Sequence, residues 1–233
     1  MDFSEPEHFY TVYDRHRTYV YAEIRRKHLA EFGRNIARPA EFRPTHRVLE
    51  LGCGVGLFLA YLQAIGIKDF VGVEMDVKAK DFMPPAIREK VLTSSFETFF
   101  SDWNKDAQPL FDRIVLLDVF EHFSPGEGVA LLRKICDLLT DDGRVVLRVP
   151  NAASPWGLQY QHNDLTHKTS YAPGNIRQLA LAAGMDCVAR LPYSRGSVVR
   201  RMTNGLIERA LDAVLVDPPP IWSANFIVIL KKA

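Results

Sequence analysis

Short apolar runs alternate with segments of helical apolar spacing along most of the chain. The runs predict seven strands, over residues 47–51, 70–74, 90–93, 113–117, 144–149, 185–190 and 225–230. Apolar residues recur every three or four positions over 56–65, 125–139 and 175–183, which predicts helices. Because the strands are apolar throughout, helices should cover both faces of the sheet, as in a doubly wound parallel α/β fold.

The two ends of the chain depart from this regular pattern. Residues 9–37 carry aromatic and apolar side chains at helical spacing, which predicts a helical cap or lid over 1–44. The last two apolar runs predict a hairpin-like end whose last strand is antiparallel, with a helix-like insert between them. The apolar stripe of this insert, Leu206 to Leu215, is interpreted as core packing, with partner or membrane contact as the alternative. Residues 45–233 then form one domain with inserts at 151–172 and 192–222.

Composition limits the number of domains, the kinds of partner and the cellular compartment that we expect. A chain of 233 residues suits one domain, and its formal net charge of +1 gives no reason to expect a nucleic-acid partner. The three cysteines are far apart, so neither a zinc site nor a disulfide framework is predicted. The acidic, polar start does not resemble a signal peptide, and no apolar run reaches the roughly 18 residues of a membrane span. We expect a cytoplasmic protein.

Alternating glycines mark the first strand-to-helix turn, in the sequence VLELGCGVG. At the carboxyl end of a strand, Gly52, Gly54 and Gly56 let a ligand approach the backbone, although a tight turn alone also favours glycine. The third glycine comes one position too early for the dinucleotide fingerprint, which disfavours a nicotinamide oxidoreductase. Glu74 ends the next strand, and its carboxylate can accept both hydroxyls of a ribose.

The order of four motifs extends this pattern. VLELGCGVG, VGVEMD, FDRIVLLDVFEHF and LLTDDGRVVLRVPN follow one another, the last with a predicted turn at 141–143. Over about residues 45–232 the chain resembles the class I S-adenosylmethionine (SAM)-dependent methyltransferases. The later segment HNDLTHKTSYAPGNIRQLALAAGMDCV is similar to a branch of small-molecule O-methyltransferases that includes ubiquinone-type and glycan- or natural-product-modifying enzymes.

The resemblance implies a set of contacts to SAM. Glu50 would order the glycine loop and the amino group, Glu74 would bind the ribose, and Asp118 would lie beside the methionine moiety. Many relatives carry an aspartate against the adenine where this chain has Ser95, whose hydroxyl can substitute. The implied cofactor residues are Glu50, Gly52, Cys53, Gly54, Gly56, Glu74, Met75, Ser95, Phe96, Asp118 and Val119.

Methyl transfer is an in-line displacement, so the enzyme's main task is to align the acceptor, the methyl group and the sulfur. A hydroxyl acceptor also benefits from a general base, and histidine titrates near neutral pH. The candidates are His122, His162, Asp164 and His167, with packing against the glycine-loop helix as the alternative for His122 and capping of the loop as the alternative for His167. The same residues with Glu121 include metal-ligand types, but no HExxH pair is present and we expect no metal.

The acceptor should bind between the cap, the 151–172 loop and the 192–222 insert. The loop offers Trp156, Tyr160 and Tyr171 for stacking. Arginines near the insert suit a phosphate or carboxylate, unless they form a solvated helix face: Arg190, Arg195, Arg200, Arg201 and Arg209. We therefore expect methylation of a hydroxyl on an anionic small molecule or glycan, such as a phosphorylated or nucleotide-linked sugar. N-methylation and a SAM-binding partner protein without catalysis remain alternatives, and the aromatics near the start suit a lid or a homodimer contact.

Overall fold

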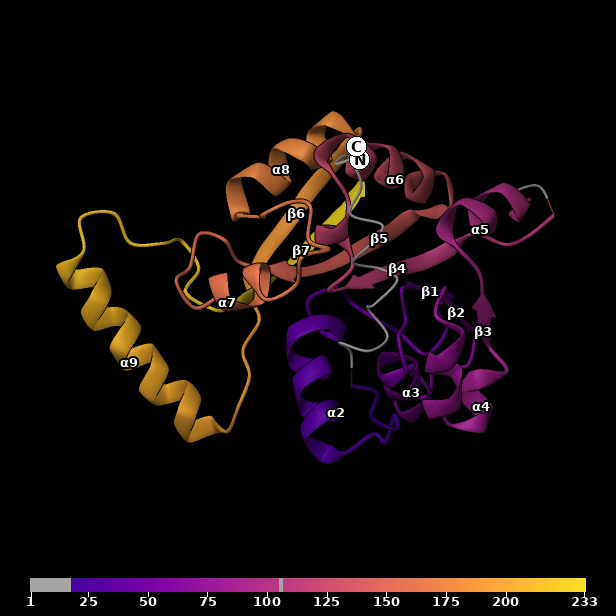
Figure 1. The fold of residues 1–233 in the computed structure, drawn as a ribbon, viewed down its shortest axis with the longest axis horizontal. Helices are drawn as coiled ribbons and strands as arrows, with labels where there is room; N and C mark the ends of the chain where they lie inside the picture. Colours follow the sequence, from indigo (N-terminus) through magenta and orange to yellow (C-terminus); the bar gives the residue numbers. More distant parts are fainter. Residues whose placement is uncertain (1–17, 105–106) are drawn as a thin grey trace, which may run out of the picture.

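The computed structural model of this chain describes residues 18–104 and 107–233. Its centre is a seven-stranded sheet with the order β3-β2-β1-β4-β5-β7-β6 (Figure 1). The strands are β1 (Val48–Leu51), β2 (Phe70–Glu74), β3 (Val91–Thr93), β4 (Phe111–Leu117), β5 (Leu139–Pro150), β6 (Met185–Pro192) and β7 (Asn225–Lys232). All neighbouring pairs from β3 across to β5 are parallel, and β7 is antiparallel to both β5 and β6. The predicted seven-stranded fold with an antiparallel last strand is confirmed.

Helices surround this sheet in the described part of the chain. They are α2 (Arg26–Phe32), α3 (Leu57–Ala64), α4 (Pro85–Arg88), α5 (Phe96–Asp102), α6 (Pro125–Asp137), α7 (Leu158–His162), α8 (Pro173–Ala182) and α9 (Val198–Val214). Shorter helical segments are η1 (Gly33–Ala37), η2 (Val77–Phe82) and η3 (Phe120–His122). None of these helices combines the length and the apolar character that crossing a bilayer requires.

The strand side chains alternate between two cores. On β4, Ile114 and Leu116 belong to the core shared with α5, α6 and α8, whereas Val115 belongs to the core under α2, α3 and α4. The same alternation on β5 sends Val146 to the second core. Both faces are therefore covered, which is why the strands read as continuous apolar runs.

The predicted turn at 141–143 is wrong. Phe111 pairs with Leu139 and Arg113 with Arg144, so the residues between Leu139 and Arg144 form an irregularity within β5. Gly143 permits this local crowding, because a Cβ there would lie 2.8 Å from the Thr140 carbonyl oxygen. The predicted strand start at Arg144 marks where regular pairing with β4 resumes.

Only part of the expected helical cap lies in the described residues. Residues 1–17, including most of its aromatics, lie outside them, and residues 18–25 have no regular secondary structure. Packing explains the difference: the Ala22 N–H donates to the Phe82 carbonyl oxygen at 2.9 Å, and the Tyr19 ring stacks on Phe82 at 5.2 Å. Helix α2 begins only at Arg26.

The expectation that the insert packs into the core is also wrong. Helix α9 stands apart from the body of the domain (Figure 1), and none of its residues is buried. Leu206 and Ile207 are 65% and 56% exposed. The sheet faces are already occupied by the other helices, which leaves no apolar surface for the stripe to cover.

Arg113 joins the sheet to the segment after η1, and its loss should destabilise the fold. Its buried guanidinium donates to the carbonyl oxygens of Ala40 (2.6 Å), Glu41 (3.1 Å) and Asp112 (2.6 Å). We expect Arg113→Met to lower the free energy of unfolding by about 3 kcal/mol, because these acceptors lose their donor. Urea denaturation measures this. Arg133→Met, which removes one exposed hydrogen bond to Ala182, should change stability by less than about 1 kcal/mol.

Candidate active site

A cavity of about 890 Å3 lies where the carboxyl ends of β1, β2 and β4 meet. It is lined by the glycine loop after β1, the ends of β2 and β4, the start of α5, η3 and the loop that holds Asp164 and His167. All of the cofactor residues implied by the sequence resemblance line this cavity, with the exception of Gly56. The topology has therefore brought segments far apart in sequence to one edge of the sheet.

The glycine loop is built by backbone conformation. Gly52, Gly54 and Gly56 have φ angles of 72°, 54° and 76°, in the region that favours glycine. A Cβ at Gly52 would also lie 2.5 Å from Val119 Cγ2, and one at Gly56 would lie 2.7 Å from Ile87 Cγ2. Because these glycines have no side chains, Val119 and Ile87 can pack directly against the loop. The loop therefore lies close to the end of β4.

Two buried carboxylates border the loop. Glu74 accepts hydrogen bonds from the Gly54 N–H (2.7 Å) and the Asp76 N–H (2.9 Å), so it fixes the loop to the end of β2. Each carboxylate oxygen retains a second acceptor position for a ribose hydroxyl. Glu50 Oε2 has no hydrogen-bond partner among the described residues. Burial raises the pKa of Glu50 well above its usual range, with Glu74 adding to the effect and Arg148 opposing it.

An ion pair at the centre of the cavity floor was not predicted. Arg148 of β5 donates through Nε to Asp118 Oδ1 at 2.9 Å and through Nη2 to Oδ2 of the same carboxylate. Its Nη1 also donates to the Tyr193 hydroxyl at 3.0 Å. Burial alone lowers the pKa of Arg148, but Asp118 and Tyr193 outweigh it and raise the pKa. Asn225 of β7 donates to Asp118 Oδ1 at 3.2 Å, so the floor joins three strand ends.

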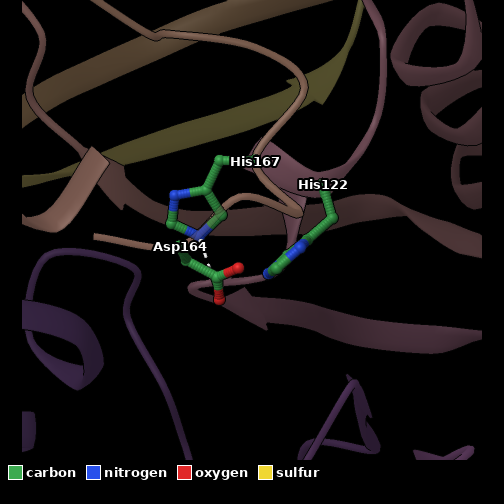
Figure 2. A group of neighbouring side chains, drawn as sticks. All are labelled: His122, Asp164 and His167. Atoms are coloured by element: carbon green, nitrogen blue, oxygen red, sulfur yellow. Dashed lines mark ion pairs between the residues drawn. The ribbon is translucent and has the colours of Figure 1, made fainter. Parts of the chain in front are cut away.

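The predicted catalytic residues divide into two groups. His122, Asp164 and His167 come together beside the cavity, with their side chains directed toward one another (Figure 2). His167 Nε2 lies 3.9 Å from Asp164 Oδ2, beyond hydrogen-bond distance. His162 at the end of α7 is exposed and does not line the cavity.

Hydrogen bonds hold both histidine rings in place. Thr166 Oγ1 donates to Asp164 Oδ1 (2.6 Å) and lies 2.9 Å from His122 Nδ1. His167 Nδ1 contacts the Gln161 carbonyl oxygen at 2.9 Å, which can only accept. The His167 ring therefore carries its lone pair on Nε2. Burial and then the neighbouring His167 lower the pKa of His122 to about 4, which keeps that ring neutral.

The charges around the cavity differ from the expected basic surface. Of the predicted arginines only Arg195 lines it, stacked over the Tyr160 and Tyr193 rings at 5.8 and 5.4 Å. Arg200, Arg201 and Arg209 lie on α9, and Arg190 donates to the Pro173 carbonyl oxygen. The lining contains eight carboxyl side chains and three cationic ones. The carboxyl side chains are those of Glu50, Glu74, Asp76, Glu97, Asp118, Glu121, Glu127 and Asp164, and the cationic ones are those of Arg148, Lys168 and Arg195.

Sequence reasoning missed several lining residues and chose some that lie elsewhere. Arg148 interrupts the apolar run VVLRVP, and a charged residue in a buried strand signals a partner. Asn225 gives no such signal, since it is the first residue of a strand far from Asp118 in sequence. Trp156 and Tyr171 do not line the cavity; Trp156 is exposed and Tyr171 is buried in the core.

Comparison with known proteins agrees with this architecture. Residues 13–190 match a methyltransferase domain family, and the chain belongs to that family. A SAM-dependent methyltransferase from Archaeoglobus fulgidus has a TM-score of 0.68 at 21% identity, covering 96% of this chain and all of that one. An O-methyltransferase (NcsB1) from neocarzinostatin biosynthesis, solved with SAM and 2-hydroxy-5-methyl naphthoic acid, has a TM-score of 0.56 at 17% identity, covering 88% of this chain and 55% of that one.

A curated relative matches only part of the chain. The (S)-coclaurine N-methyltransferase of Thalictrum flavum subsp. glaucum is 33% identical over 106 residues, which is 45% of this chain. This chain matches 28% of that relative's length. Together with the fold, the family match identifies a class I SAM-dependent methyltransferase domain whose cofactor is SAM.

The observed residues fit SAM. Its methionine moiety carries an ammonium and a sulfonium, and the buried Glu50 Oε2 is an acceptor that an ammonium would satisfy. Glu74 has acceptor positions left for the ribose, and Met75, Ser95 and Phe96 line the part of the cavity beyond it. Ser95 also caps α5 by accepting the Thr98 N–H at 3.2 Å, so a role toward adenine would be shared with a structural one.

Glu50 should link SAM binding to proton release. Burial raises its pKa in the ligand-free protein, whereas a bound ammonium favours the carboxylate and lowers that pKa. We expect the calorimetric binding enthalpy of SAM to vary with the ionisation enthalpy of the buffer, in the direction of protons released. Glu50→Gln should abolish that dependence and weaken binding by about 1–3 kcal/mol. An equal dependence in the variant would contradict this role.

Proposed function

We propose that this chain transfers the methyl group of SAM to a hydroxyl of a small molecule or glycan. The observation that supports this most is the position of His122, Asp164 and His167, which border the same cavity as the glycine loop. The acceptor would bind between this cluster and Tyr160, with the described part of the cap, including Phe32, closing the cavity. Release of S-adenosylhomocysteine from SAM with a panel of hydroxylated acceptors tests the proposal; a protein that only binds SAM would release none.

The reaction needs alignment and one proton transfer. The acceptor oxygen attacks the methyl carbon in line with the carbon–sulfur bond, whose electron pair leaves on sulfur to give S-adenosylhomocysteine. The hydroxyl proton leaves toward the histidine cluster. The Nε2 lone pair of His167 is oriented by the bond that holds its Nδ1, so this group is arranged before the acceptor arrives.

An anionic acceptor is the narrower part of the proposal. Its support comes from Arg195 and Lys168, although Lys168 already pairs with Glu127 at 3.2 Å and Arg195 Nε lies 3.7 Å from Glu31. The acceptor's anionic group would therefore lie at the outer part of the cavity, away from the buried carboxylates. Sugar phosphates and hydroxylated carboxylic acids are the compounds to assay first.

Methylation of an amine is the second candidate. The excess of carboxyl side chains in the lining favours a cationic or amine-bearing molecule, and the relative from Thalictrum flavum is named as an N-methyltransferase. An amine that is already neutral needs no base in the transfer step. Assays with matched hydroxyl and amine acceptors separate the two candidates.

His167 should affect turnover more than cofactor binding. We expect His167→Ala to lower kcat with a hydroxyl acceptor about 100-fold or more, because activation of the hydroxyl is lost. The dissociation constant of SAM should stay within about twofold of the original. His162→Ala is the matched comparison, since this histidine lies outside the cavity lining. An equal loss of kcat in both variants would contradict the assignment to the cluster.

Arg195, rather than the arginines of α9, should affect acceptor binding. We expect Arg195→Ala to raise the KM of an anionic acceptor roughly tenfold, as for the loss of a charged contact of about 1.4 kcal/mol. Arg200→Ala should leave that KM nearly unchanged, because Arg200 does not line the cavity. The reverse result would mean that the acceptor reaches α9.

A further inference from the structure

Helix α9 carries an apolar face that the described part of the domain leaves uncovered (Figure 1). The side chains of Val199 and Val214, near its two ends, are 70% and 80% exposed. A continuous exposed apolar surface bordered by polar residues marks an interaction site. The face consists of Val198, Val199, Met202, Leu206, Ile207, Ala210 and Val214.

The polar face of α9 is the one turned toward the domain. Asp212 accepts a hydrogen bond at 2.8 Å from Nε1 of Trp222, a buried residue between α9 and β7. Arg201, Gly205 and Glu208 precede it at helical spacing, so they share this side, and all three are partly buried. The apolar residues lie on the opposite side and therefore point away from the domain.

The charged side chains of α9 are divided between its two sides. Its two acids, Glu208 and Asp212, lie on the side of the domain. Arg200 and Arg209 instead lie at the two borders of the apolar face, because Arg200 is seven residues before Ile207 and Arg209 seven residues after Met202. The outward half of the helix thus combines apolar side chains with positive charge and has no carboxylate.

This distribution of charge distinguishes between the possible occupants of the face. In a symmetric pair of chains the same surface meets itself, so Arg200 and Arg209 of both chains would surround one contact without an acid between them. An anionic lipid surface is complementary instead. Apolar side chains enter the acyl boundary, while arginines lay their stems along it and reach the phosphates.

We propose that α9 docks the chain on a membrane surface that contains anionic lipids, with its axis in the plane of the interface. The apolar face would enter the lipid, and the polar face would stay with the domain through Asp212 and Trp222. The proposal takes up the alternative of membrane contact that the sequence left open for this apolar stripe. It is independent of the methyl acceptor and of the proposed function.

Flotation with lipid vesicles tests the surface without any acceptor. The full chain is mixed with vesicles of phosphatidylcholine, with or without phosphatidylglycerol, and the bound fraction is measured over a range of lipid concentrations. We expect binding to the anionic vesicles to be at least about tenfold tighter than binding to the neutral ones. This preference should decrease as the salt concentration rises, because salt screens the two arginines.

Variants separate the apolar contribution from the charged one. Leu206→Glu places a carboxylate within the apolar face and should weaken binding to anionic vesicles at least about tenfold. Arg200→Glu combined with Arg209→Glu should remove the preference for anionic vesicles. Arg88→Glu combined with Arg177→Glu is the matched control, since it changes the net charge equally at exposed positions of α4 and α8. The control should retain the preference.

None of these substitutions should affect folding. Leu206 is 65% exposed and lies on the side of α9 that faces away from the domain. Thermal unfolding and SAM binding of each variant should therefore equal those of the original chain, which makes a loss of vesicle binding specific to the surface.

Several results would overturn the membrane surface. One is the absence of binding to anionic vesicles by a chain that binds SAM. Another is vesicle binding that Leu206→Glu leaves unchanged, or that the matched arginine control loses equally, since either would indicate general attraction of charge. A concentration-dependent dimer in analytical ultracentrifugation that Leu206→Glu dissociates, without vesicle binding, would show that a second copy covers α9 instead.

Discussion

The ion pair between Arg148 and Asp118 is the interaction on which the arrangement of the cavity depends. Arg148 projects from the middle of the sheet with a side chain only 12% exposed, where an uncompensated charge would be prohibitive. Asp118 meets it from a backbone with a φ of 57°, an unfavourable conformation for a residue other than glycine. The same guanidinium binds Tyr193, whose hydroxyl donates to Glu31 of α2 at 2.8 Å. One buried cation thus fixes β4, β5, the segment after β6 and the helix above the cavity.

This cation is outnumbered by the acids around it. Arg148 neutralises Asp118 directly, and it lowers the pKa of Glu50 and Glu121 without overcoming the effect of their burial. The floor therefore holds more acidic than basic side chains in a region of low dielectric constant, where a bound cation would favour their ionised forms. The ammonium of bound SAM would be stabilised on the side of Glu50. On the side of the histidine cluster, the Glu121 carboxylate has no hydrogen-bond partner among the described residues, and its Oε1 lies 4.0 Å from His167 Nε2.

The sequence contained the sheet and much of the cofactor site, but not the contacts that depend on distant partners. Apolar runs reveal buried strands, and motifs that follow strands must lie at the same edge of a parallel sheet, so Glu50, Glu74 and Asp118 could be placed together. Periodicity could not show that α9 has nothing to pack against, because an apolar stripe is the same in a core and on a surface. Periodicity also could not show that His167 lines the cavity and His162 does not, since this depends on how the loop folds onto η3.

That loop is held to η3 by backbone bonds to a residue of the cavity itself. The Glu121 carbonyl oxygen accepts the N–H groups of Lys168 (2.9 Å) and Thr169 (3.1 Å), and Thr169 Oγ1 donates to the Phe123 carbonyl oxygen at 2.7 Å. The loop that carries His167 is thereby fixed to the segment that follows β4, where the cofactor site ends. Methyl transfer is governed by alignment of two bound molecules, so a rigid connection between their sites fixes the distance that matters. A change in the loop away from any reacting group would accordingly alter turnover through geometry, while the glycine loop and SAM binding stay the same.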